Sequence, residues 1–68
     1  MEFRQILREF LTENGISQNE FARKIGAKSG QVSEWLRGKA KPGYDYLKKM
    51  AEAFNISADY FLGIIDEY

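Results

Sequence analysis

Apolar side chains recur along this chain with the three- and four-residue spacing of amphipathic α-helices. The first stripe consists of Phe3, Ile6, Leu7, Phe10 and Leu11. It stops at Asn14-Gly15, where glycine tolerates the left-handed conformation that ends a helix. Ser17 and Glu20 then have the spacing of a capping box, and Gly26 ends the short helix that follows them. The buried side of that second helix carries Phe21, Ala22 and Ile25.

Three further helices are predicted downstream. Helical spacing resumes at Val32, Trp35 and Leu36, and Gly38 ends this third helix before a basic turn over residues 39–43. The fourth stripe consists of Tyr44, Leu47, Met50, Ala51 and Phe54. Asn55 is expected as a left-handed cap, and Ser57 caps a fifth helix that carries Tyr60, Phe61 and Leu62. Because no segment alternates with period two, the sequence predicts an all-α fold, a compact five-helix bundle forming a single domain over residues 1–68.

The third predicted helix has two contrasting sides. Trp35 lies on its apolar side, and we expect it to anchor the core, although stacking on a nucleotide base is an alternative. The opposite side is small and polar: Ser29, Gly30, Gln31, Ser33, Glu34 and Arg37. A helix side that is rich in hydrogen-bonding groups and not needed for packing is available to a partner.

Composition excludes several kinds of chemistry. The chain has 68 residues and contains neither cysteine nor histidine, which removes disulfides, Cys or His metal sites and imidazole catalysis. No apolar run approaches the roughly 20 residues that a membrane span needs, and no signal-peptide pattern opens the chain. We therefore expect a cytoplasmic protein without a membrane partner, a cofactor or a small-molecule substrate. Scattered acids and the lack of a phosphate-binding loop make an enzyme an unfavoured interpretation.

The formal net charge is zero, but the charges are segregated along the chain. Residues 1–22 carry a net charge of −2, residues 23–49 carry +6, and residues 50–68 carry −4. A basic middle between acidic ends indicates an anionic partner, although a merely solvated surface is the alternative.

The arrangement of small and apolar residues over 17–38 is typical of a helix-turn-helix. Ala22, Gly26, Val32 and Trp35 have a spacing that resembles the lambda-repressor-like family, which includes phage repressors, Cro proteins and xenobiotic-response-type regulators. The segment KPGYDYLKKMAEAFNISADYFLG resembles the fourth and fifth helices of the same family. The resemblance covers nearly the whole chain. It implies a sequence-specific binder of double-stranded DNA, a transcriptional regulator acting as a repressor, with its third helix in the major groove.

The resemblance also implies roles for individual residues. The positions that face the bases and the nearby backbone are Lys28, Ser29, Gly30, Gln31, Ser33 and Glu34. The positions expected at phosphates are Gln18, Arg37, Lys39 and Lys41. Three residues depart from the usual pattern: Ser29 often corresponds to glutamine, Gly30 lacks a side chain, and Glu34 brings a negative charge toward DNA. Glu34 is favourable if it accepts from a cytosine amino group and unfavourable if it meets a phosphate.

Two further expectations concern packing and assembly. Many relatives pair an arginine of the first helix with a glutamate at the end of the third, whereas the matching positions here are Leu11 and Leu36, so an apolar contact is predicted. A homodimer on paired half-sites is expected, with residues 63–68, chiefly Ile64, Ile65 and Tyr68, as its contact; a frayed terminus is the alternative. Tyr44 and Ile56 either lie near that contact or belong to the core. The competing function is a protein-interaction module with this fold, such as an antitoxin or anti-regulator.

Overall fold

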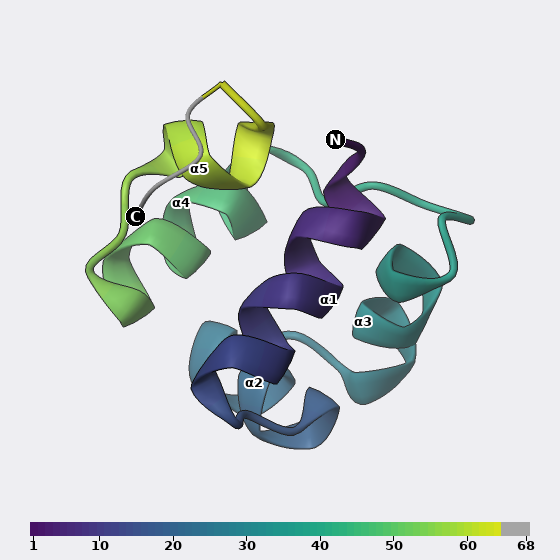
Figure 1. The fold of residues 1–68 in the computed structure, drawn as a ribbon. Coiled ribbons are helices and arrows are strands. Elements are labelled where there is room, and N and C mark those ends of the chain that lie inside the picture. The colour runs from purple at the N-terminus through teal and green to yellow at the C-terminus, as the bar shows by residue number, and fades with distance from the viewer. Residues whose placement is uncertain (65–68) are drawn as a thin grey trace.

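The fold consists of five α-helices arranged around one core (Figure 1). A computed structural model describes residues 1–64. The helices are α1 (Phe3–Asn14), α2 (Gln18–Ile25), α3 (Ser29–Leu36), α4 (Tyr44–Phe54) and α5 (Ala58–Leu62). No strand occurs within residues 1–64, and the predicted all-α architecture is confirmed. In the same residues, no helix is long and apolar enough to cross a bilayer.

The predicted helix ends are present. Gly15, Gly26 and Asn55 follow α1, α2 and α4 in the left-handed conformation, as their sequence context indicated. The Ser17 hydroxyl accepts the Glu20 N–H at 3.1 Å and so satisfies one of the free donors at the start of α2. The Ser57 hydroxyl accepts the Asp59 N–H at 3.2 Å at the start of α5. The short connection from Ile25 to Ser29 places the start of α3 close to the end of α2.

The core is built around Phe10 of α1, which is fully buried. Its ring packs edge-on against Phe54 of α4 and Phe61 of α5 at centroid distances of 5.2 and 5.3 Å. Phe21 of α2 stacks on Phe54 at 5.3 Å. Rings from four helices therefore meet at one point, and α1 lies between α3 on one side and α5 on the other (Figure 1).

Two residues of the predicted apolar stripes are exposed, and Tyr44 therefore does not belong to the core, which was one of its two interpretations. Tyr44 is 77% exposed, because it is the first residue of α4 and lies beyond the part of the helix that covers the core. Tyr46 is half-buried instead and packs edge-on against Trp35 at 5.3 Å. Leu62, at the end of α5, is 53% exposed. Ile56 packs against the core, which was one of the two interpretations given for it.

Candidate nucleic-acid interface

Helix α3 is fixed in the bundle by its apolar side. Val32 and Trp35 are buried, and Trp35 is only 3% exposed. Its indole packs edge-on against Phe3 at 6.3 Å as well as against Tyr46. A ring so enclosed has no face left for a nucleotide base, so Trp35 is the core anchor that the sequence predicted. The alternative of base stacking by Trp35 is wrong.

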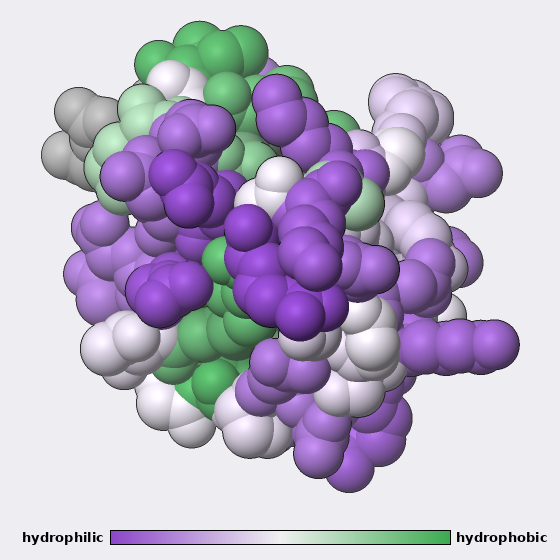
Figure 2. All heavy atoms as spheres, turned by 90° about the vertical axis from the view of Figure 1, so that its right-hand side faces the viewer, coloured by the Kyte–Doolittle hydropathy of each residue, from purple (hydrophilic) through white to green (hydrophobic). Residues whose placement is uncertain are grey.

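The opposite side of α3 lies at the surface, and we call Ser29, Gly30, Ser33, Glu34 and Arg37 its free face. Gly30 and Arg37 are exposed, and the other three are half-buried. Figure 2 views the molecule from the side on which α3 lies in Figure 1, and hydrophilic residues (purple) and residues of intermediate hydropathy (white) cover most of that surface. The free face therefore combines a rigid backbone with accessible hydrogen-bonding groups.

The start of α3 is held by side chains at the start of α2. The Gln18 Nε2 donates to the Ser29 carbonyl oxygen at 3.0 Å and lies 3.1 Å from the Ser29 Oγ. The Ser29 hydroxyl in turn donates to Asn19 Oδ1. These bonds bring Gln18 and Ser29 together, two residues predicted at phosphates and at bases respectively. Asn19 was missed in the sequence, although it sits in the first turn of α2 beside Gln18.

Gln31 lies differently from the other residues predicted to face bases. It is half-buried, and its Oε1 accepts the Lys28 N–H at 3.1 Å and the Tyr46 hydroxyl at 3.3 Å. The side chain thus caps the start of α3 and joins that helix to α4. Lys28 itself is exposed in the position just before α3.

Cationic side chains surround the other end of α3. Arg37 pairs with Glu34 at 3.3 Å, so the two charges of the free face compensate each other in part. The Arg8 Nη2 of α1 donates to the Leu36 carbonyl at 3.2 Å. Lys39 and Lys41 are exposed in the connection to α4. A cation at a helix carboxyl end satisfies free carbonyls and complements the helix dipole, so Arg8 stabilises the end of α3.

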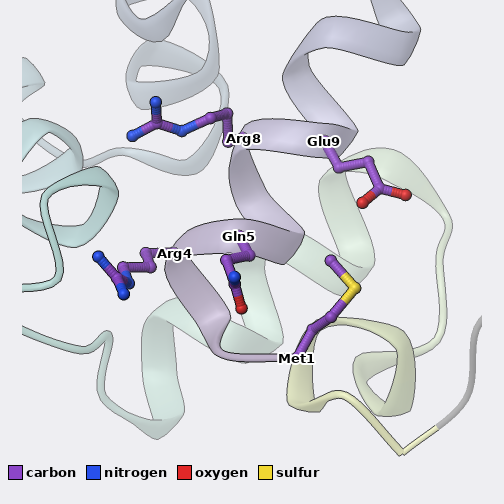
Figure 3. A pocket seen from close by; sticks show the side chains of 5 residues that line it. All are labelled: Met1, Arg4, Gln5, Arg8 and Glu9. Carbon is purple, nitrogen blue, oxygen red and sulfur yellow. The ribbon is translucent and has the colours of Figure 1, made fainter.

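Sequence reasoning assigned no role to the two arginines of α1. Figure 3 shows Arg4 and Arg8 extending to the same side of α1, toward the connection that follows α3, while Glu9 and Met1 extend to the other side. Arg4 packs so closely on Gly38 that a Cβ there would lie 2.9 Å from the Arg4 Cδ. The sequence signal that could have identified them is their spacing of four residues, which places both arginines on one side of a helix.

A hollow opens between α1, α2 and the free face of α3. Its polar lining consists of Arg8, Thr12, Gln18, Ser33 and Arg37, and Leu11 and Leu36 form its apolar part. Leu11 is buried and Leu36 is half-buried against the core. Leu11 and Leu36, for which the sequence predicted an apolar contact, thus line the same hollow.

The residues predicted for dimer contact are only partly described. Ile64 is 68% exposed, and Ile65 and Tyr68 lie outside the described residues. Leu62 and Met1 are also exposed. A Cβ on Gly63 would lie 3.2 Å from the Met1 carbonyl oxygen, so the start of the chain adjoins the end of α5. The N-terminus and α5 lie in the upper part of Figure 1, and hydrophobic surface (green) gathers in the upper part of Figure 2.

Comparison with known proteins agrees with this architecture. Residues 7–61 match the model of a family described as helix-turn-helix. This chain belongs to that family. The resemblance to lambda-repressor-like proteins, which the spacing over residues 17–38 predicted, is thereby confirmed.

Individual relatives are similar over most of this chain. It is 33% identical over 57 residues to the HTH-type transcriptional regulator ImmR of Bacillus subtilis (strain 168), covering 84% of this chain and 45% of that regulator. The helix-turn-helix chain thus spans less than half the length of this relative. The solution structure of the DNA-binding domain of the P22 C2 repressor has a TM-score of 0.83 at 22% identity, covering 91% of this chain and 82% of that domain. A transcriptional regulator from Listeria innocua has a TM-score of 0.83 at 24% identity, covering 98% of this chain and 63% of that one.

Proposed function

We propose that this domain is a sequence-specific DNA-binding transcriptional regulator, a repressor, that inserts α3 into the major groove of double-stranded DNA. The observation that carries the proposal is the free face of α3, which is polar and accessible on a helix held rigidly by Val32 and Trp35. The major groove is about 12 Å wide and admits one α-helix, and its base edges present distinguishable donors and acceptors. The repressor and regulator relatives support the same function.

Phosphate contacts are assigned to the carboxyl end of α3 and to the start of α2. Arg37, Lys39 and Lys41 are exposed at its carboxyl end, where they reach one side of the groove. Gln18 opens α2, where unpaired backbone N–H groups favour a phosphate. These contacts set the position of the helix without selecting a sequence. The segregated charge explains how a neutral chain can bind a polyanion.

Base contacts are assigned to Lys28, Ser29, Gly30, Gln31, Ser33 and Glu34. Ser29 and Glu34 present oxygen atoms on the free face. Gln31 has its oxygen engaged by Lys28 and Tyr46, so only its Nε2 is left to approach DNA as a donor. Substitution of Ser29, Gln31 or Glu34 is expected to change which base is preferred, rather than the affinity for all sequences.

The proposal includes a homodimer on the operator. One α3 contacts only a few base pairs, too few to single out a site among a genome of competitors. Two-fold pairing would set the half-sites about 34 Å apart, one turn of DNA. Exposed Leu62 and Ile64 offer apolar surface for a second copy of the chain.

The test is selection of bound duplexes from a random DNA pool, followed by titration at several salt concentrations. Replacing Lys39 or Lys41 with alanine should weaken binding to all sequences and flatten the salt slope by nearly one unit each. Lys24→Ala is the matched control, because the Lys24 ammonium lies 5.9 Å from the Phe54 ring centroid, on the α4 side of α2. Failure to enrich any sequence, or binding that does not respond to salt, would refute the proposal. Salt-insensitive binding to a protein would instead support the interaction-module alternative.

A further inference from the structure

The hydroxyl of Ser29 has almost no hydrogen-bonding capacity left for DNA. A serine hydroxyl has one hydrogen to donate and two lone pairs that accept. The hydrogen goes to Asn19 Oδ1, and one lone pair accepts from the Gln18 Nε2 at 3.1 Å. One lone pair remains. A hydroxyl that could otherwise both donate and accept is thereby reduced to an acceptor.

The orientation of the Gln18 amide fixes this assignment. The same Nε2 lies 3.0 Å from the Ser29 carbonyl oxygen, which can only accept. The atom facing Ser29 must therefore be the amide nitrogen and not the oxygen. Because Gln18 supplies the donor, the Ser29 Oγ accepts on that side and its own hydrogen is free for Asn19.

Glu34 presents a second group that can only accept. An ionised carboxylate has no hydrogen to donate. The Arg37 Nη2 lies 3.3 Å from the Glu34 Oε2, one turn further along the free face, and orients the carboxylate there. Ser29 and Glu34 are five residues apart, which is roughly 7.5 Å along the helix, and they lie at opposite edges of the free face, so they would meet different base pairs.

We infer that Ser29 and Glu34 act together as paired acceptors, so that the preferred half-site presents an exocyclic amino group to each of them. In the major groove only adenine N6 and cytosine N4 carry such groups, whereas guanine O6 and thymine O4 are acceptors that would face an acceptor. Asn19 is then a positioning residue, which acts by occupying the Ser29 hydrogen. This inference rests on the proposed function and names the class of base that the free face selects.

Base analogues test the inference with the unaltered protein. From a duplex selected by the wild-type chain, adenine is replaced by purine, which lacks the N6 amino group, or cytosine by pyrimidin-2-one, which lacks the N4 group. Removing the amino group opposite Ser29 should weaken binding about 3- to 10-fold, and removing that opposite Glu34 about 10- to 100-fold. The same replacement outside the half-sites should leave affinity unchanged. Equal binding to the analogue duplexes would overturn the inference.

Variants of Asn19 and Ser29 test the positioning role. Ser29→Ala identifies the base pair that depends on Ser29, because preference should be lost there alone. Asn19→Ala should release the Ser29 hydrogen and let guanine or thymine replace the amino-bearing base that faces Ser29, so that discrimination falls to within about 2-fold. Asn19→Asp keeps an acceptor for Ser29, and so should keep the preference while weakening binding to every sequence through its charge.

The outcomes separate this inference from the proposed function. If no sequence is enriched, the proposed function fails. If sequences are enriched but guanine or thymine is preferred as the base that faces Ser29, DNA recognition stands and the acceptor assignment fails. Unchanged preference in Asn19→Ala, with thermal unfolding like that of the wild type, overturns the positioning role of Asn19.

Discussion

Gly30 is a glycine inside the proposed recognition helix that the fold does not require. It is the second residue of α3, its φ is not positive, and a Cβ built there has no heavy atom within 4 Å. Alanine is favoured over glycine in a helix interior by about 1 kcal/mol, and roughly half of that is expected so near the helix start. Gly30→Ala should therefore stabilise the domain and raise the melting temperature by about 2–4 °C, measured by circular dichroism.

Gly63→Ala is the matched control, because the same change should have the opposite sign there. Gly63 has a φ of 81°, and an added Cβ would lie 3.2 Å from the Met1 carbonyl oxygen and 3.3 Å from the Ile6 Cδ1. The left-handed conformation alone costs a side chain about 1–2 kcal/mol. A destabilised Gly30→Ala would refute the structural argument. DNA affinity is a separate readout: a stabilised variant that binds weakly would show that DNA approaches the backbone at Gly30.

Three further predictions concern how α1, α2 and α3 are held. Leu36→Ala should cost about 2 kcal/mol in urea unfolding, the lower end for such changes, because Leu36 is half-buried; a loss below about 0.5 kcal/mol would remove it from the core. Arg8→Ala should cost about 1 kcal/mol through the lost bond to the Leu36 carbonyl, and no loss would make that bond irrelevant to stability. Ser17→Ala should cost about 1 kcal/mol, and Ser17→Asp should restore it, in thermal unfolding; equal behaviour of the two variants would contradict the cap.

The fold could be predicted because local signals and packing agree along most of the chain. Gly15, Gly26 and Asn55 end helices at the positions that their left-handed tendency indicated. Periodicity failed at Tyr44, which continues an apolar stripe in the sequence but lies at the exposed start of α4. A stripe records which side of a helix is apolar, and it does not record where along the helix the core begins.

The candidate site was predictable in its location and less so in its chemistry. The resemblance and the polar side of the third predicted helix located the free face. The bonds from Gln18 and Asn19 to Ser29 depend on how two helices cross, which spacing does not give. Gln31 was grouped with residues that face bases, and its contact with Tyr46 follows from the position of α4. Such contacts decide which side-chain atoms remain available for a partner, and residue type alone does not show this.

The junction of α1 with α3 combines apolar side chains with one polar connection. Because Leu11 and Leu36 are apolar, neither position requires a charge to be desolvated between the helices. Arg8, one turn before Leu11, bonds the Leu36 main-chain carbonyl, and it stays exposed to solvent. Because a carbonyl is present whatever side chain follows it, this bond tolerates leucine at position 36. The arginine thereby orients the carboxyl end of α3 while its charge remains at the surface that we propose for DNA.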